Sequence, residues 1–558
     1  MSAPSPKFAV RLLPSLTDVA FLMPIAFLFL RMGGAAGMLG DGDTGWHIRT
    51  GEWILANGQV PHEDIFSYTR AGQPWFAWEW LSDIFFAWLH QHAGMAAVVL
   101  ASIGIVCVTS VLLFRILVRK CGNALLSIAI IFLVTGGTAV HWLARPHLFT
   151  LLFTVIFYSI LERVKDGNQR LLWALPALMV LWTNLHGGFF VGIILLGAYA
   201  AGEIAGAVFN PDAAQRASAF RRSLPYFAAA GVCFVVTFIN PYFYHLHSHI
   251  YEYLTDKYQY KNIVEFQSFD FHHPVRLYFE PMLGLGLAAA VWNLYHKQFV
   301  YTVLLVGWAH LALTMVRNVP IFMLVAAPAV AVMLETFLRQ LPSMSIAGWM
   351  RSAAAKIHSF AVDFGSTDAI ARLHLASAAA VGLLIALFYA PNPPAQFRAE
   401  YDVKRYPAKA VEMLRKAGSP EIIFTDDEWG DYLIYRLYPS NRVFIDGRSD
   451  FYGSTFNNQY MDVMNVKYDW EKSLDKYHVN TILLSPNASL ASTLKESRRW
   501  RPIYDDGVAI VFQANPKSAA GGAQVSVDSN GGKERDREIT KSQTSDLMIT
   551  KTIRSEPS

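Results

Sequence analysis

The sequence predicts a mainly α-helical, polytopic membrane protein, in which a bundle of transmembrane helices precedes a small C-terminal α/β soluble domain. Of the 558 residues, 53% are hydrophobic and only 16% are charged, a composition that does not fit one soluble domain. The apolar residues gather in runs that approach the length of about 20 residues that a helix needs to cross a bilayer. After residue 391 the pattern changes to short strands and amphipathic helices.

Eleven apolar segments are candidate membrane-spanning helices, and the fifth of them is short. The first lacks a small-residue cleavage site, so we expect it to remain as the first helix. All three cysteines lie in or beside apolar segments, so a disulfide framework is not expected. The segments are 14–37, 94–117, 123–141, 147–162, 171–185, 187–206, 224–240, 277–295, 299–316, 318–338 and 372–390.

The basic residues between these segments predict the orientation, because cytoplasmic loops are rich in Lys and Arg. When the helices are counted alternately, every basic cluster falls on the same side. This places the N-terminus in the cytoplasm and, after an odd number of spans, the C-terminal domain outside, as in a bacterial inner or plasma membrane. The net charge of +4 is small, so no nucleic-acid partner is expected. The clusters include Lys7 and Arg11, Arg115 to Lys120, Arg163 to Arg170, Arg216 to Arg222, and Arg339 to Lys356.

The same alternation places the polar motifs on the outer face. Ionisable groups at membrane depth are costly and usually face a protein interior or a wet cavity. We therefore expect one outward-facing site. The motifs contain Asp41 and Asp43, Arg145 and His147, Asn184 and His186, the histidines of "HLHSH" (His245, His247 and His249), and Arg317.

Domain boundaries follow from the changes in composition. Residues 1–390 form the transmembrane domain, whose first outer loop is 38–93. Residues 391–515 form the outer-face α/β domain, with predicted strands in "EIIFT", "RVFID" and "VNTILLS" and a hairpin in "WRPIYDDGVAIVFQ". Residues 516–558 are polar and without apolar periodicity, so we expect them to be disordered.

The first outer loop is unusual because an acidic pair, Asp41 and Asp43, follows directly on a membrane helix. The segments "TGWHIRTGEWILANG" and "PWFAWEWLSDIFFAWLH" come next, and their indoles favour the membrane interface. An acidic group at that depth would meet the head group of a lipid-linked substrate.

At these residues the chain resembles the GT-C superfamily of integral-membrane glycosyltransferases, which includes protein O-mannosyltransferases and oligosaccharyltransferases. Members carry an acidic motif in the first outer loop, two juxtamembrane helices after it, and often a soluble outer domain at the C-terminus. The pattern from "DGDTGWHIRTGEWI" to "FIDGRSDFY" also resembles a set of bacterial membrane proteins of this superfamily. The Lys-Pro-Pro segment of mannosyltransferase-like members is absent here, where the chain reads "AWEWLSD".

The resemblance implies a cell-envelope hexosyl or pentosyl transferase that moves a sugar from a polyprenyl-phosphate donor to a lipid, glycan or protein acceptor, with inversion. Asp43, with Asp41 beside it, would supply the general base. Arg145 and Arg317 would stabilise the leaving phosphate, since guanidinium matches phosphate oxygens. The remaining candidate substrate-binding residues are His47, Glu79, His147, Asn184 and His186.

The cofactor is left open by the residues. Two close carboxylates repel each other unless a cation or hydrogen bonds intervene. Asp41 and Asp43 could therefore hold a divalent cation, Mg²⁺ or Mn²⁺. Oligosaccharyltransferases use a metal and mannosyltransferase-like members generally do not.

Other interpretations exist for most of these residues. Asp43 could cap the juxtamembrane helix, and Arg145 and Arg317 could snorkel at helix ends. Asp446, Arg448 and Asp450 of "FIDGRSDFY" could bind the acceptor or simply form a turn. For the whole protein, the rival functions are a transporter or flippase of lipid-linked glycans, and a noncatalytic scaffold on the outer face.

Overall fold

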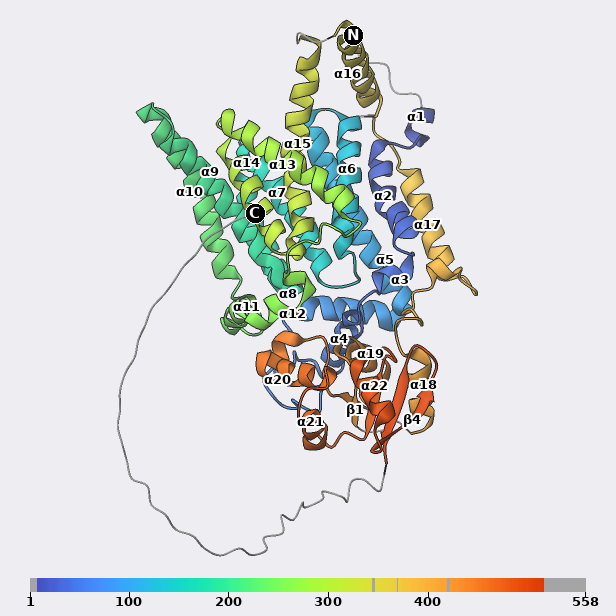
Figure 1. The fold of residues 1–558 in the computed structure, drawn as a ribbon. Coiled ribbons are helices and arrows are strands. Elements are labelled where there is room, and N and C mark those ends of the chain that lie inside the picture. The colour runs from blue at the N-terminus through green and yellow to red at the C-terminus, as the bar shows by residue number, and fades with distance from the viewer. Residues whose placement is uncertain (1–7, 344–346, 369, 419–421, 516–558) are drawn as a thin grey trace, which may run out of the picture. The chain divides into compact units, whose positions relative to one another are not determined.

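The computed structural model describes residues 8–343, 347–368, 370–418 and 422–515. The part of it up to Ala514 is one compact unit that combines a helical bundle with a five-stranded sheet (Figure 1). The predicted fold class, a polytopic helical bundle with a small C-terminal α/β region, is confirmed. The predicted disordered tail, 516–558, lies outside the described residues.

Each of the eleven predicted segments coincides with a helix, but only seven helices in the described part of the chain are long and apolar enough to cross a membrane. Four fall short: α8 has 12 residues, α14 and α17 have 16 and 14, and α10 begins with a charged stretch. The seven helical runs are Val10–Arg31, Trp80–Cys121, Ala124–His141, His147–Lys165, Gly187–Val208, Arg276–Tyr295 and Val316–Ser343, which contain α2, α5, α6, α7, α9, α13 and α15 and in some cases the adjoining short turns. The bundle helices are α2 (Leu16–Arg31), α5 (Trp80–Cys121), α6 (Ala124–Thr138), α7 (His147–Lys165), α8 (Ala174–Leu185), α9 (Phe190–Val208), α10 (Ala213–Val236), α13 (Arg276–Tyr295), α14 (Phe299–Thr314), α15 (Val319–Gln340) and α17 (Leu375–Phe388).

Helix α5 joins two predicted elements into one run of 42 residues. Its first part is the indole-rich interfacial segment, and its second part is the predicted span from residue 94. The two parts meet at a kink, where Gly94 has a φ of +71°, a backbone conformation that glycine adopts without a steric penalty. The kink lets the same helix lie along the first outer loop and then enter the bundle.

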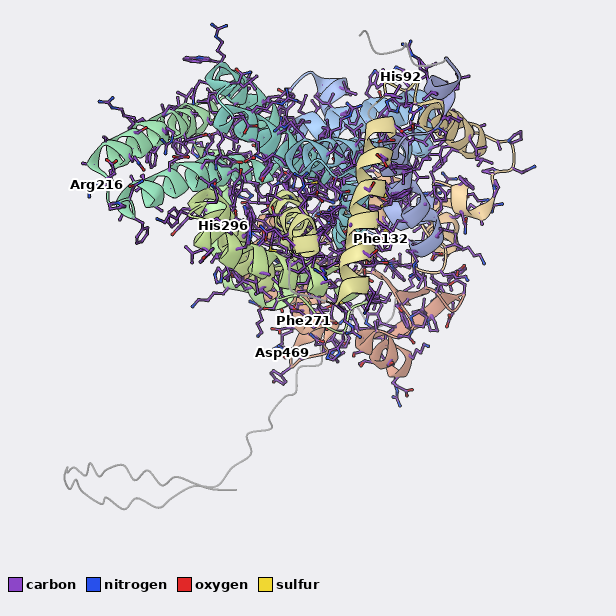
Figure 2. All side chains as sticks on the ribbon, turned by 90° about the horizontal axis from the view of Figure 1, so that it is seen from above. His92, Phe132, Arg216, Phe271, His296 and Asp469 are labelled. Carbon is purple, nitrogen blue, oxygen red and sulfur yellow. The ribbon has the colours of Figure 1, made fainter. Side chains whose placement is uncertain are left out.

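Basic residues gather at one end of the bundle helices. Lys120, at the end of α5, pairs with the buried Glu162 of α7, which also accepts a hydrogen bond from the Tyr301 hydroxyl (2.9 Å). Arg339, in the last turn of α15, pairs with Glu335 (2.6 Å). In Figure 2, Arg216 lies at the tip of the α9–α10 pair, near the start of α10. The other ends of α5, α7 and α15 carry the predicted site residues, so the two classes of polar group lie at opposite ends of the same helices.

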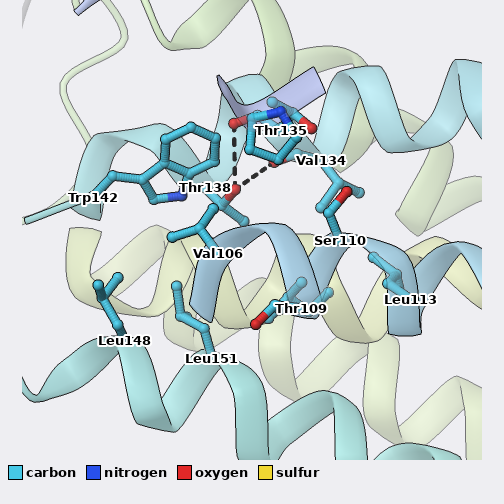
Figure 3. A pocket seen from close by; sticks show the side chains of 12 residues that line it. Val106, Thr109, Ser110, Leu113, Val134, Thr135, Thr138, Trp142, Leu148 and Leu151 are labelled. Carbon is cyan, nitrogen blue, oxygen red and sulfur yellow. Dashed lines mark hydrogen bonds between the residues drawn. The ribbon is translucent and has the colours of Figure 1, made fainter. Parts of the chain in front are cut away.

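The middle of the bundle is apolar and closely packed. The void shown in Figure 3 has a volume of about 20 Å³ and lies among α2, α5, α6, α7 and α15. Apolar side chains such as Val106 and Leu148 line it, and the Thr138 hydroxyl turns away to donate to the main-chain carbonyl of Val134 (2.8 Å). It is a packing defect the size of one water molecule, far smaller than the cavity described below.

The C-terminal sheet has the strand order β2-β1-β3-β5-β4. The central strands are parallel where a helix connects them, and β5 runs antiparallel to both β3 and β4. All four residues of β3 are buried, as expected for a strand covered on both faces. The elements are α18 (Ala408–Lys416), β1 (Ile422–Phe424), α19 (Asp427–Leu437), β2 (Arg442–Val443), α20 (Ser449–Met464), α21 (Trp470–Lys476), β3 (Thr481–Leu484), α22 (Ser489–Glu496), β4 (Trp500–Asp505) and β5 (Ile510–Ala514).

The first outer loop is joined to this sheet. Ser67 forms a parallel β-bridge with Val443 of β2, in which Tyr68 N–H donates to the Val443 carbonyl (3.1 Å) and Val443 N–H donates to the Phe66 carbonyl (3.0 Å). Beside this bridge the buried Arg448 guanidinium contacts Asp64 of the loop (2.8 Å). The loop therefore connects the bundle to the sheet through both main-chain and charged contacts.

Candidate active site

The acidic motif of the first outer loop begins helix α4 (Asp43–Asn57). Asp41, not Asp43, satisfies the helix start, because its carboxylate accepts the Asp43 N–H (2.7 Å). The capping interpretation of Asp43 is therefore wrong, and its carboxylate is left for other contacts. Gly42 lies against α19: a Cβ at this position would be 2.6 Å from the Glu428 carbonyl oxygen and 2.7 Å from Asp431 Cβ.

Arg145 connects the two acidic residues. Its Nη1 lies 2.8 Å from Asp41 Oδ2, its Nη2 lies 2.6 Å from Asp43 Oδ2, and its Nη1 is also 3.4 Å from Glu265 Oε1. Burial opposes the charge of the guanidinium, but the surrounding carboxylates outweigh it and raise the pKa of Arg145 above its ordinary value. Arg145 thus supplies the cation that the sequence predicts between these carboxylates.

This arrangement does not fit a metal site formed by Asp41 and Asp43. The guanidinium takes the position between the carboxylates that a divalent cation would need. The described residues also contain no group of three or more His, Cys, Asp and Glu placed to hold an ion. The histidines of "HLHSH" make separate contacts on α11 (His245–Thr255), where His247 meets the Thr237 hydroxyl (2.8 Å) and His249 meets Asp450 (2.8 Å).

A cavity of about 380 Å³ opens beside Asp43. It lies between the bundle and the C-terminal region, because residues 447–450 form part of its wall. Six of the nine predicted site residues line it, so the structure brings together groups that are more than 270 positions apart in the sequence. They are Asp43, Glu79, Arg145, His147, His186 and Arg317.

The other three predicted residues do not line the cavity. Asp41 pairs with Arg145 (2.8 Å), and its side chain is 29% exposed. His47 is buried, with its Nδ1 2.6 Å from Asp83 Oδ1. The Asn184 side chain accepts a hydrogen bond from Trp80 Nε1 (2.8 Å) and donates to the Ile239 carbonyl (2.9 Å), which makes it a packing element of the bundle.

Glu79 is oriented by two imidazoles. Its Oε1 lies 3.2 Å from His186 Nε2 and its Oε2 lies 3.5 Å from His47 Nε2. His186 Nδ1 accepts the Gly188 N–H (2.9 Å), so its Nε2 carries the hydrogen that points to Glu79. Burial raises the pKa of Glu79 to about 8 and lowers the pKa of His186 to about 3. At neutral pH this wall of the cavity therefore carries little charge.

Arg317 differs from Arg145 in its partners. No carboxylate of the described residues lies within ion-pairing distance of it. Its Nη1 is 3.5 Å from the Tyr253 hydroxyl, and its guanidinium lies over the Phe266 ring, 4.8 Å from the centroid. Arg317 is consequently the cavity arginine whose charge is not neutralised by an ion pair.

Several helices begin at the cavity. The helices α5, α7, η3 (Gly187–Phe189) and α15 start directly after Glu79, Pro146, His186 and Asn318, and all four of these residues line the cavity. Helix N-termini carry unpaired N–H groups and a partial positive charge, so they favour anions. The cavity therefore suits an anionic group near Arg317 and the helix starts.

Comparison with known proteins agrees with this architecture. No protein-family model matches the chain, and no curated protein matches it. The oligosaccharyltransferase of Archaeoglobus fulgidus in the apo form aligns with a TM-score of 0.52 at 13% identity, over 84% of this chain and 69% of that chain. The same protein tethered to an acceptor peptide containing the NVT sequon aligns with a TM-score of 0.51 at 12% identity, over 84% and 68%.

The fold is therefore like that of the archaeal oligosaccharyltransferase. At these identities the likeness concerns the arrangement of the chain alone. The expected GT-C-like helical bundle is confirmed as a fold, whereas a mannosyltransferase-like subclass is not.

The structure also adds residues that the sequence did not suggest. Asp431 Oδ2 of α19 and Asp43 Oδ1 both lie beside Gly447, and Glu265 of η4 (Val264–Phe266) joins Arg145. Neither has a local motif, because Glu265 follows a short helix and Asp431 lies inside an amphipathic one. Asp450 lines the cavity, and the "FIDGRSDFY" segment was the one signal that pointed there. Arg448 of that segment also lines the cavity, but its guanidinium is held in a buried ion pair with Asp446 (2.7 Å).

Part of the cavity lining is apolar. Ile194 of α9 lines the cavity and is 45% exposed, and α9 is one of the helices that are long and apolar enough to cross a membrane. The cavity thus combines charged groups such as Asp43 with a set of apolar side chains. The apolar side chains are Phe190, Val191, Ile194, Leu311, Met315 and Ile321.

Proposed function

We propose that this protein is a glycosyltransferase that moves a sugar from a polyprenyl-phosphate-linked donor to an acceptor on the outer face of the membrane. The observation that supports this proposal is a single cavity lined both by a carboxylate, Asp43, and by apolar side chains of α9, α14 and α15. A lipid-linked sugar has the same division into a polar and an apolar part. The GT-C-like fold agrees with this function.

Asp43 acts as the general base in this proposal. It takes the proton of the acceptor hydroxyl or amide while the acceptor atom forms a bond to the anomeric carbon, and the bond from that carbon to the phosphate oxygen breaks. One displacement of this kind inverts the anomeric centre. Arg145 keeps Asp43 in place, since both Nη atoms are held by carboxylates.

Arg317 is the residue that we assign to the leaving phosphate. Its guanidinium has no carboxylate partner within ion-pairing distance among the described residues, whereas Arg145 is shared among three carboxylates. Asn318 and the start of α15 lie beside it. A phosphate placed there lies on the apolar side of the cavity, so its polyprenyl chain can pass Met315 and Ile194 toward the bilayer.

The acceptor would enter from the opposite side, where Ser449 and Asp450 form the wall. The archaeal oligosaccharyltransferase was solved with a tethered acceptor peptide. For the present chain a peptide, a glycan and a lipid are all compatible with this polar wall.

Replacement of Asp43 with Asn tests the proposal. We expect transfer to fall by about 10²- to 10⁴-fold, because the amide cannot accept the proton, while the protein still folds.

Mass spectrometry of outer-face glycans and glycolipids would first identify the product lost on deletion of the gene. Cells with D43N would then be compared with cells carrying D462N, a matched change at an exposed position. Wild-type product levels with D43N would refute the proposal. Net movement of lipid-linked sugar in liposomes without transfer would favour a flippase.

A further inference from the structure

The carboxyl groups of Asp43 and Asp431 meet across the boundary between the bundle and the sheet. They belong to α4 and α19, which lie nearly 390 positions apart in the chain. A Cβ built on Gly447 would be 2.8 Å from Asp43 Oδ1 and 2.5 Å from Asp431 Oδ2. Both oxygens therefore border the same point, and only a glycine at 447 leaves room for them.

Asp431 is held in a fixed orientation. The Gly447 N–H donates to its Oδ1 (2.9 Å), so its Oδ2 is the oxygen that faces Asp43. The residue is 1% exposed, and its Oδ2 shares the space beside Gly447 with Asp43 Oδ1. Two ionised carboxylates this close repel each other, whereas a proton on one of them lets it donate to the other.

The surrounding charges are consistent with one shared proton. Burial raises the pKa of both carboxyls, the charge of Asp43 raises the pKa of Asp431 further, and the charge of Asp41 raises the pKa of Asp43, whereas Arg145 beside Asp43 offsets only part of this effect. Arg145 can balance one negative charge and already contacts Asp41. The titratable groups that face the pair from the neighbouring elements are Asp41, Glu79, Arg145, Glu265, Tyr401 and Asp446.

We propose that Asp431 is the positioning residue for the general base. It shares a proton with Asp43, so the C-terminal region contributes one of the two carboxyl groups of the pair. This inference rests on the proposed function. In the resting state the pair holds one proton and one negative charge. During transfer the acceptor proton moves to Asp43, the acceptor bonds to the anomeric carbon, and the sugar–phosphate bond breaks with its electron pair on the phosphate. The pair then holds two protons and releases one to water.

The variant D431N tests this inference. The amide can keep the bond from Gly447 N–H and can donate to Asp43, but it has no proton to lose. In the wild-type protein, loss of the shared proton at alkaline pH leaves two carboxylates that repel each other and ends the positioning of Asp43, so the transfer rate falls there. This alkaline limb of the transfer rate should be absent in D431N and should return in D431E, which restores a carboxyl. The same alkaline limb in D431N as in the wild-type protein would overturn the inference and leave Asp431 a packing role.

A second measurement does not depend on the donor. Infrared difference spectra of the purified full-length protein between acidic and alkaline pH report protonated carboxyl groups. We expect D43N and D431N to remove the same component of the carboxyl band, whereas D462N at the surface removes none of it. If D43N and D431N remove separate components, the shared proton is refuted. If the shared component is present but wild-type protein transfers no sugar, the proposed function fails and the pair stands.

Discussion

Two arginines of the cavity, Arg145 and Arg317, differ in the groups that they contact, and these contacts determine what each can do. Arg145 and Arg317 are both partly buried arginines near helix starts, and from sequence they are equivalent. In the structure Arg145 contacts Asp41, Asp43 and Glu265, whereas Arg317 contacts a tyrosine and an aromatic ring. The first therefore orients carboxylates, and the second is able to bind a phosphate.

Glu79 provides a test of pH dependence. Burial raises its pKa from 4.5 to about 8, so the folded protein binds its proton more tightly than the unfolded chain does. The stabilisation from Glu79 is therefore complete below about pH 4.5 and is lost as the pH rises toward 8. We expect E79Q, which stays neutral, to raise the melting temperature by a few °C more at pH 8 than at pH 5. Thermal unfolding in detergent at both values measures this.

The control for E79Q is E412Q, a change of the same kind at a residue on the surface of α18 whose side chain is 34% exposed. It should have the same small effect at pH 5 and pH 8. If E79Q and E412Q respond alike, Glu79 is not protonated in the folded protein.

At the scale of residues, the sequence supports prediction where a motif lies next to a helix end. Asp43, Arg145, His147, His186 and Arg317 lie near the predicted outer ends of spans, Glu79 lies in the first outer loop, and alternation of the spans predicts that they come together. Asp431 could not be found in this way. Its position depends on how α19 packs on α4, and nothing near Asp431 in the sequence encodes that tertiary contact.

Among the elements, α4 of the first outer loop and α19 of the C-terminal region pack closely against each other. Gly42 touches the Glu428 carbonyl and Asp431, and Gly45 lies against Tyr435. In the same contact Arg49 Nε donates to the Tyr435 carbonyl (2.9 Å). The small residues of "DGDTG" are therefore as important as its acids, because they allow the base to reach its partner.

Replacement of Gly42 with Ala should separate these helices. The added methyl group would overlap the Glu428 carbonyl, so α19 has to move and Asp431 loses its contact with Asp43. We expect transfer to fall by at least about tenfold, with a smaller loss of stability, of about 1–3 kcal/mol for overpacking. G104A, on an open surface of α5, is the control and should leave both quantities unchanged. Equal activity of the two variants would contradict the close contact.

The length of each helix decides whether a predicted apolar segment can cross a membrane. Apolar composition alone predicts eleven spans, but α8 contains only 12 residues and α10 has three arginines in its first half. Their ends are fixed by the neighbouring turns at Asn210 and His186, which composition does not reveal. The number of membrane-crossing helices is therefore less predictable than their positions.

In the molecule as a whole, the contact between bundle and sheet depends on Arg448. Its guanidinium binds Asp64 and Asp446 and lies 4.5 Å from the Trp75 ring centroid. We expect R448M to destabilise the protein by about 3–5 kcal/mol, because it leaves two buried carboxylates without their cation. Thermal unfolding measures this change. R415M at an exposed ion pair of α18 should cost no more than about 1 kcal/mol, and a similar loss in both variants would contradict the role of Arg448.

Orientation in the membrane is a prediction for the whole chain. The three native cysteines are buried, so single cysteines can be introduced at exposed positions and labelled selectively. A membrane-impermeant thiol reagent should label Y468C (95% exposed), in the sheet region, in intact cells. It should label W349C (75% exposed) only after permeabilisation. The reverse pattern would place the cavity on the cytoplasmic side and exclude the proposed reaction.

The β-bridge from Ser67 to Val443 bears on attempts to study the C-terminal region alone. Strand β2 lies at one edge of the sheet, and an uncovered edge is a template for pairing with another chain. A fragment of residues 391–515, which begins after α17, would expose this edge, together with the apolar surface that covers Phe66. Such a fragment should aggregate, and fusing residues 58–74 to it should restore a soluble monomer.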